Sequence, residues 1–379
     1  MTATGGGGSY ISHNTSMAPS LDDDNSLFNF VVQDGYGVKG MADLGLSKVP
    51  ARYIQQQKER IDKKNARMCV LPAIDLLKLE GDEHDRVVEE ITRAAETLGF
   101  FQVVNHNVPV KLLEKLKDAV HLFFGQAPEE KAVYRKGLSP SPLVQYGTSF
   151  APEKEKALEW KDYVSMIYTN DAEALQHWPK ECKEEALEYL KMSLHMVRKL
   201  MELLMGNLGV KPDDSKIDAL IGFKMVNMNF YPTCPNPELT IGVGRHSDMG
   251  ALTVLVQDGI GGLYVKLEED IEDVGKKGEW MEIPPIQGAL VINIGDTLQI
   301  ISNGKYKSAE HRVGTTSTKS RVSIPIFTMP NPTEKIKPLP QLAERDGGAR
   351  FREVVFQDYM SNFFNNAHEG KKSLQFAQV

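Results

Sequence analysis

The stretch GRHSDMGALTVLVQDG (residues 244–259) joins a histidine and an aspartate to a run of apolar and β-branched residues that ends in an Asp-Gly turn. The same character extends over residues 223–327, where short runs rich in Val, Ile, Thr and Leu alternate with Gly, Pro and Asn turns. Short β-prone runs bounded by turn residues are typical of antiparallel strands. Residues 221–330 therefore predict a β-sandwich or barrel.

Polar residues interrupt the apolar alternation of this segment at three places, each time as a pair two residues apart. The pairs are Asn229 with Tyr231, His246 with Asp248, and Arg321 with Ser323. Residues two apart in a strand point to the same face of the sheet. We therefore expect each pair to project as a unit toward one side, with all three pairs serving one site.

The residue types of these pairs predict a metal beside an anion. Burying charged side chains inside a sheet is costly unless they bind something. His246 and Asp248, with His311 on a later strand, supply the two-histidine, one-carboxylate set that holds non-haem Fe(II) and leaves coordination positions open. Arg321 offers a planar fork of donors suited to a carboxylate, and Ser323 adds a hydroxyl. An HxD or RxS pair alone is a weak signal, but the three elements in this order within one β-rich segment are specific.

The rest of the chain predicts helices around this β core. Residues 27–220 are expected to be mostly helical, and residues 331–379 are expected to form a C-terminal helical extension. Apolar residues at helical spacing place three helices, at residues 85–98, 111–124 and 183–208. Residues 1–26, rich in Gly, Ser, Thr and Asp, predict a disordered leader. The expected class is α+β with a mainly β core flanked by helices.

Composition excludes several classes of function. A formal net charge of −7 without a basic stripe argues against a nucleic-acid partner. No apolar run approaches the roughly 18 residues that a membrane span needs, and the N-terminus lacks the pattern of a secretory signal. Cys69, Cys182 and Cys234 form no CxxC motif, which suits a reducing compartment. We expect a cytoplasmic protein with no membrane partner.

Four motifs in sequence order extend this interpretation to a known family. They are GFFQVVNH (99–106), NFYPTCP (229–235), GRHSD (244–248) and RVS (321–323). In these motifs the chain resembles the plant 2-oxoglutarate/Fe(II)-dependent dioxygenases, over nearly everything after the leader.

The resemblance implies a double-stranded β-helix (jelly roll) core that uses Fe(II), 2-oxoglutarate and O2, with ascorbate sustaining activity. It also implies that Asn229 and Tyr231 lie near the 2-oxoglutarate, which Arg321 and Ser323 hold by its far carboxylate.

Further stretches are similar to the coumarin-forming branch of this family. They are YGTSF (146–150), EWKDY (159–163), KMVNMN (224–229) and GIGGLYV (259–265). Within this branch, the stretches YTNDAEALQHWP (168–179) and AEH (309–311) are most similar to the enzymes that act on scopoletin. This similarity implies hydroxylation of scopoletin at C8 to give fraxetin, with release of succinate and CO2. Two alternatives stay open: ortho-hydroxylation of feruloyl-CoA or p-coumaroyl-CoA, and a non-catalytic small-molecule binding protein on the same fold. The complete triad favours catalysis.

A small aromatic substrate calls for an apolar pocket, and Tyr146, Phe150 and Phe327 are the candidates to line it. Packing in the core is the alternative role for each of them. Asn107 stands where the family usually has glycine, and asparagine is the best substitute at a positive φ, so we expect little consequence. The chain is expected to act as a monomer.

Overall fold

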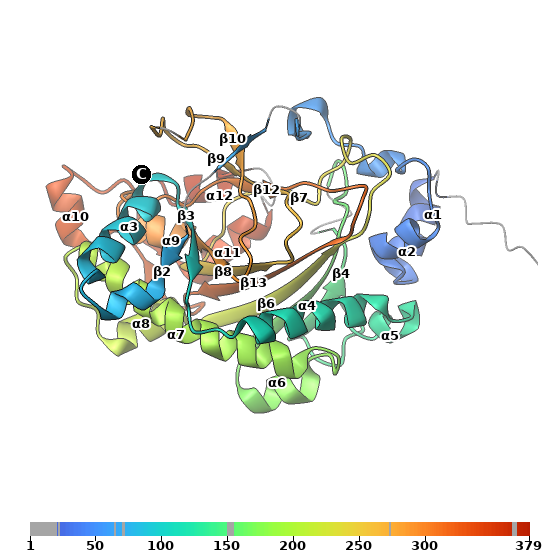
Figure 1. The fold of residues 1–379 in the computed structure, drawn as a ribbon, viewed down its shortest axis with the longest axis horizontal. Coiled ribbons are helices and arrows are strands. Elements are labelled where there is room, and N and C mark those ends of the chain that lie inside the picture. The colour runs from blue at the N-terminus through green and yellow to red at the C-terminus, as the bar shows by residue number, and fades with distance from the viewer. Residues whose placement is uncertain are drawn as a thin grey trace, which may run out of the picture.

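The structure is a computed structural model, and its strands form two facing sheets (Figure 1). It describes residues 21, 23–63, 66–69, 73–149, 155–272, 274–365 and 370–379. The larger sheet has eight strands, and its order explains how distant segments meet. The order is β2 (Ile74–Asp75), β3 (Phe100–Val104), β11 (Leu290–Ile294), β8 (Leu252–Gln257), β13 (Arg321–Met329), β6 (Phe223–Tyr231), β5 (Asp162–Tyr168) and β4 (Val144–Gly147).

The smaller sheet has five strands and lies above the larger sheet in the view of Figure 1. Its order is β1 (Arg67–Met68), β10 (Trp280–Glu282), β9 (Leu263–Lys266), β12 (His311–Val313) and β7 (Val243–His246). Pairing within residues 223–329 is antiparallel throughout, so the central strands of both sheets come from the segment predicted to be β-rich. The predicted double-stranded β-helix is confirmed.

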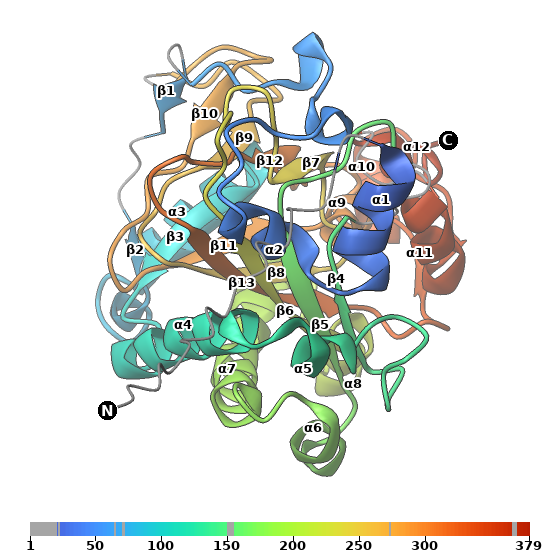
Figure 2. The same cartoon turned by 90° about the vertical axis from the view of Figure 1, so that its right-hand side faces the viewer.

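Helices cover the outer face of the larger sheet. The amphipathic helices α4 (Val110–Gly125) and α7 (Lys183–Asn207) pack against each other and against β6, β8 and β13 (Figures 1 and 2). The other helices are α1 (Asp24–Phe28), α2 (Gly37–Asp43), α3 (His84–Thr97), α5 (Pro128–Ala132), α6 (Asp171–His177), α8 (Asp214–Leu220), α9 (Asp296–Ile301), α10 (Pro340–Arg345), α11 (Phe356–Asn365) and α12 (Lys372–Gln375). A separate two-stranded antiparallel sheet pairs β14 (Lys335–Ile336) with β15 (Val354–Val355). No helix in the described part of the chain is both long and apolar enough to cross a membrane.

The N-terminal half contributes more strand than the sequence predicted. Strands β2 to β5 all precede residue 221, yet they form both edges of the larger sheet.

The predicted disordered leader, residues 1–26, includes the start of a helix. Helix α1 begins at Asp24. Asp23 caps this helix by accepting hydrogen bonds from the backbone N–H groups of Asn25 and Ser26. Residues 1–20 and 22 of that leader lie outside the described residues.

The register between β6 and β13 arranges polar side chains in rows. Arg321 lies opposite Tyr231, and Ser323 lies opposite Asn229. The two polar pairs predicted from the sequence are therefore neighbours on adjacent strands, and all four side chains line one cavity between the sheets. Farther along the same strands, Phe327 lies opposite Met225, so the rows change from polar to apolar.

Candidate active site

Three potential metal ligands meet where β7 and β12 run side by side. His246, the last residue of β7, lies directly opposite His311, the first residue of β12, and Asp248 follows two residues after β7 ends. Oδ1 of Asp248 lies 3.8 Å from Nε2 of His246 and 3.7 Å from Nε2 of His311. Within the described residues, this is the only group of three such side chains whose ligand atoms all lie within 4.8 Å of one another.

Backbone carbonyls fix the tautomer and the orientation of both imidazoles. Nδ1 of His246 lies 2.9 Å from the carbonyl oxygen of Gly244, and Nδ1 of His311 lies 3.1 Å from that of Ala309. A carbonyl only accepts, so each Nδ1 carries the proton and donates it, and each Nε2, which faces Oδ1 of Asp248, is the ring nitrogen whose lone pair can coordinate a cation. Two neutral imidazoles and a carboxylate are the donor set of non-haem Fe(II) sites, so the residues present fit that metal.

Asn293 on β11 holds the carboxylate of this group, and the sequence interpretation missed it. Its Nδ2 donates to Oδ2 of Asp248 at 3.0 Å, which leaves Oδ1 of the aspartate toward the histidines. The available signal was a single amide within the apolar run LVINI (290–294), where β11 is buried along its whole length. A lone buried polar residue of this kind requires a partner.

A second buried network fixes the turn between the ligands. Asp296 accepts hydrogen bonds on Oδ2 from the hydroxyls of Ser247, at 3.2 Å, and Tyr359 on α11, at 2.7 Å. The backbone N–H of Asp296 also donates to the carbonyl of Asp248 at 2.7 Å. Burial raises the pKa of the Asp296 carboxyl above its ordinary value, while these hydroxyl donors act against that shift. The network ties the segment around Asp248 to helix α11.

Arg321, at the far end of the cavity, has one hydrogen-bond donor without a partner among the described residues. Nη2 of Arg321 donates to Oε1 of Gln257 at 2.9 Å, and Nε donates to the carbonyl of Ile260 at 3.3 Å. Nη1 is buried and has no hydrogen-bond partner among the described residues, although Arg321 is only 1% exposed. The guanidinium also lies 5.1 Å from the ring centroid of Tyr231. A buried cation with an unused donor is a ready site for an anion.

Ser323 completes this end of the cavity. Its hydroxyl lies 3.3 Å from that of Tyr231 and accepts a long hydrogen bond, 3.5 Å, from Nδ2 of Asn229. The structure thus brings the Arg321, Ser323, Asn229 and Tyr231 side chains to one wall, as the sequence pattern predicted, with the metal-ligand group in the same cavity. Lys161, paired with Glu159 at 3.0 Å, lines the cavity too and was not predicted.

The three predicted aromatic pocket residues have different outcomes. Phe327 lines the cavity, together with Met225 and with Phe363 of α11. Phe150 lies outside the described residues. Tyr146 does not belong to the described lining, and its assignment to the pocket was wrong.

Tyr146 instead packs in the core beside α4. Its ring contacts Phe123 and Phe124, and its hydroxyl donates to the carbonyl of Gly35 at 3.3 Å. The alternating burial of β4 explains this, because the face that carries Tyr146 is the buried one.

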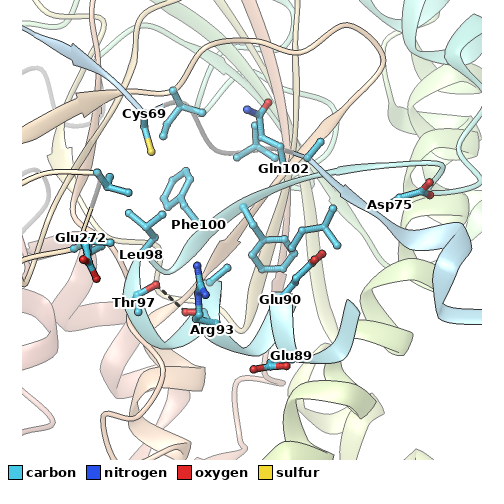
Figure 3. Close-up of a pocket in the computed structure, with 18 of the residues that line it drawn as sticks. Cys69, Asp75, Glu89, Glu90, Arg93, Thr97, Leu98, Phe100, Gln102 and Glu272 are labelled. Atoms are coloured by element: carbon cyan, nitrogen blue, oxygen red, sulfur yellow. Dashed lines mark hydrogen bonds between the residues drawn. The ribbon is translucent and has the colours of Figure 1, made fainter. Parts of the chain in front are cut away.

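A larger hollow of about 870 Å³ lies beside α3, away from this cavity (Figure 3). Its lining mixes Arg93, Glu90 and other charged residues with apolar ones, and Figure 3 shows Cys69 and Phe100 on its walls. Burial raises the pKa of the Cys69 thiol to about 11, so this cysteine is no thiolate nucleophile at neutral pH. Phe100, on the wall of the hollow, also packs against the ring of His311, at 5.5 Å between centroids.

Comparisons with known proteins agree with this site. Residues 222–330 match the 2OG-Fe(II) oxygenase superfamily, and residues 71–181 match the family described as non-haem dioxygenase in morphine synthesis N-terminal. The chain belongs to the 2-oxoglutarate- and Fe(II)-dependent dioxygenases. It is therefore an oxidoreductase with Fe(II) and 2-oxoglutarate as its cofactors.

Two curated relatives cover almost the whole chain. Scopoletin 8-hydroxylase from Arabidopsis thaliana is 62% identical over 364 residues, which are 96% of this chain and 100% of that protein. Feruloyl CoA ortho-hydroxylase F6H1-1 from Ipomoea batatas is 47% identical over 358 residues, which are 94% of this chain and 97% of that protein.

Solved structures share the fold. The crystal structure of JOX2 in complex with 2OG, Fe and JA matches with a TM-score of 0.78 and 31% identity, covering 90% of this chain and 97% of that one. The dioxygenase for auxin oxidation from rice matches with a TM-score of 0.69, covering 82% of this chain and 100% of that one. At 23% identity, the rice enzyme supports the fold alone.

Proposed function

We propose that His246, Asp248 and His311 hold the Fe(II). Support comes from the convergence of their ligand atoms within 4.8 Å and from the two backbone carbonyls that orient the imidazoles. When bound, Fe(II) couples the oxidative decarboxylation of 2-oxoglutarate by O2 to hydroxylation of the substrate, and ascorbate is expected to sustain the activity. The residues themselves contribute orientation, and the surrounding buried wall excludes water.

Arg321 and Ser323 are assigned to the distal carboxylate of 2-oxoglutarate. The observation that carries this role is the buried, unpartnered Nη1 of Arg321, whose other two nitrogens are already satisfied by Gln257 and Ile260. A guanidinium held in this way is preorganised to donate to a carboxylate. Asn229 and Tyr231 support the same end of the cosubstrate through their contacts with Ser323.

The substrate proposed is scopoletin, hydroxylated at C8 to give fraxetin. The observation that carries this choice is the 62% identity to scopoletin 8-hydroxylase over nearly the full length of both chains. A flat, rigid coumarin also suits a cavity whose substrate end is lined by Met225, Phe327 and Phe363, because such a ring can be almost wholly buried and stacked. Feruloyl-CoA is the second candidate, since several feruloyl CoA ortho-hydroxylases are 43–47% identical to this chain.

Product analysis with the two substrates side by side tests this proposal. Purified protein is incubated with Fe(II), ascorbate, 2-oxoglutarate and either scopoletin or feruloyl-CoA, and succinate and aromatic product are followed together. We expect one fraxetin for each succinate, with a kcat/KM well above that for feruloyl-CoA. A much higher kcat/KM for feruloyl-CoA, giving the ortho-hydroxylated product, would contradict the scopoletin proposal and leave the dioxygenase class intact.

A monomer in the cytoplasm completes the proposal. His246, Asp248 and His311 converge within 4.8 Å in a single chain, so the proposed metal site needs no residue of a second subunit. Cys69, Cys182 and Cys234 are buried free thiols, as suits a reducing compartment.

A further inference from the structure

Along β6, four alternate side chains line the cavity: Tyr231, Asn229, Asn227 and Met225. The first two lie opposite Arg321 and Ser323, at the end assigned to 2-oxoglutarate, and Met225 lies opposite Phe327. Asn227 therefore stands between the polar end and the apolar end of the cavity. It is one step nearer to the apolar end than the residues assigned to the cosubstrate.

The amide of Asn227 has an unused acceptor. Its Oδ1 is buried and has no hydrogen-bond partner among the described residues. Leaving a buried acceptor unpaired is unfavourable, so a side chain of this kind weakens the fold unless a ligand satisfies it. Asn229, two residues along on the same face, differs because its amide already contacts Ser323.

Asn293 carries the other unpartnered amide oxygen of this cavity, but its amide is already tied to Asp248 through Nδ2. It is accounted for as a residue that positions the metal ligand. Among the described residues Asn227 has no such tie. Its partner on β5 is Ser165, and the residues one step farther along the row, Met225 and the facing Phe327, are apolar. The amide of Asn227 is thus one of the polar groups of the cavity available to form a hydrogen bond with an aromatic substrate.

We propose that Asn227 is a specificity-determining residue that accepts a hydrogen bond from the phenolic hydroxyl beside the carbon to be hydroxylated. The inference rests on the proposed function, in which the 7-hydroxyl of scopoletin neighbours C8. A rigid ring held at this hydroxyl by Asn227 and on its faces by apolar residues has one position turned toward the metal-ligand group. A site built to bond a hydroxyl discriminates against a ligand that lacks it, because the buried partner is then left unpaired.

Two ligands that differ only at this hydroxyl test the inference: scopoletin and 6-methoxycoumarin, which has hydrogen at C7. We expect the wild type to prefer scopoletin by about 10–100-fold, both in kcat/KM and in the dissociation constant measured anaerobically by coumarin fluorescence. In Asn227→Leu the preference should fall to about one, with the KM for 2-oxoglutarate unchanged. Asn227→Ser, whose hydroxyl is too short to reach, should behave in the same way.

Met225→Leu is the matched control, because it alters the same face of β6 without changing a hydrogen-bonding group. It should shift the values for both coumarins equally. Thermal unfolding gives an independent readout: Asn227→Leu should unfold at the same temperature as the wild type or higher, since it removes an unsatisfied buried group. A large drop in unfolding temperature would mean that Asn227 is structural, and would overturn the proposal.

The outcomes separate this inference from the function on which it rests. A wild type that hydroxylates scopoletin but prefers it equally strongly after Asn227→Leu and Asn227→Ser overturns the role of Asn227 alone. A wild type that shows no preference between the two coumarins does the same. A wild type that fails to hydroxylate scopoletin overturns the proposed function, and the inference with it.

Discussion

Arg321 illustrates how one side chain joins sequence pattern to chemistry. Gln257 and the carbonyl of Ile260 fix its guanidinium, and within the described part of the chain Nη1 alone has no hydrogen-bond partner. Arg321→Lys keeps the charge but loses the planar geometry. We expect the KM for 2-oxoglutarate to rise by at least about tenfold, while the KM for the aromatic substrate changes much less. Steady-state kinetics with each substrate varied in turn measure both values, and equal changes in the two would show that the arginine is structural.

Asp162 gives a prediction about pH. Its carboxylate accepts the backbone N–H groups of Val38, at 2.7 Å, and Lys39, at 2.8 Å, at the start of α2. Burial raises the pKa of this carboxyl from 3.8 to about 6, although the two N–H donors and the nearby Lys131 act against the shift. Between these values the folded chain binds the proton more tightly than the unfolded chain, so this group makes the free energy of unfolding fall as pH rises from about 4 to about 6.

Asp162→Asn removes that titration. At about 1.4 kcal/mol per pKa unit, the stability difference between wild type and variant should change by roughly 3 kcal/mol across this window and stay constant above it. Urea unfolding at several pH values measures the difference. Parallel pH profiles for the two proteins would contradict the assignment. The lost acceptor for one N–H group lowers the whole variant curve and does not alter this comparison.

The sequence predicted the polar site residues because each combined a rare residue type with strand spacing. His246, Asp248, Arg321 and Ser323 could be paired at i and i+2, and the structure places them in one cavity. Tyr146 could not be resolved in the same way, since an aromatic residue in a strand is equally suited to core and pocket. Asn293 was missed because a single asparagine in an apolar strand carries no spacing signal. Asn227 lies two residues before Asn229, so the same alternation could have identified it.

At the scale of elements, helix α11 connects the C-terminal segment to the site. It contributes Tyr359 to the buried carboxylate of Asp296 and Phe363 and Phe364 to the cavity lining. Tyr359→Phe leaves Asp296 with one hydroxyl donor fewer and should cost about 1–3 kcal/mol of stability. It should also weaken Fe(II) binding, because Asp296 holds Ser247 between two of the ligands.

Tyr189→Phe is the control for this change. Tyr189 is a fully buried tyrosine of α7 whose hydroxyl donates to backbone carbonyls of Val254 and Ile324, away from the HxD turn. It should lose stability while Fe(II) affinity is kept. Iron titration of the folded variants distinguishes the two. An Fe(II) affinity reduced equally in both, or in neither, would show that α11 does not support the metal site through Tyr359.

The element predictions failed where periodicity carries no information. Helix α9 was read as part of the β segment because its six residues are all buried, and a helix buried on every side shows no amphipathic pattern. The short strands β2 and β4 were missed for a similar reason, since two or four residues are too few to establish alternation. The long helices α4 and α7, which bury one face each, begin and end within one residue of the predicted bounds.

At the scale of the whole molecule, the two sheets contribute different residues to the site. The smaller sheet carries both histidines, on β7 and β12, while the larger sheet carries Arg321 and Ser323 on β13 and Asn293 on β11. The proposed metal ligands and the residues proposed to hold the cosubstrate therefore line one cavity because the two sheets face each other. This division explains why residues 65 positions apart in the chain, His246 and His311, lie in register as direct neighbours.

Iron stoichiometry tests the central claim most directly. Wild type, His246→Ala, Asp248→Ala and His311→Ala are reconstituted anaerobically with Fe(II), freed of excess metal and assayed for bound iron, with circular dichroism to verify folding. We predict one Fe(II) per wild-type chain and little or none in the three folded variants, because a site short of one ligand loses affinity and geometry together. Full iron occupancy in any folded variant, with 2-oxoglutarate turnover retained, would contradict the account.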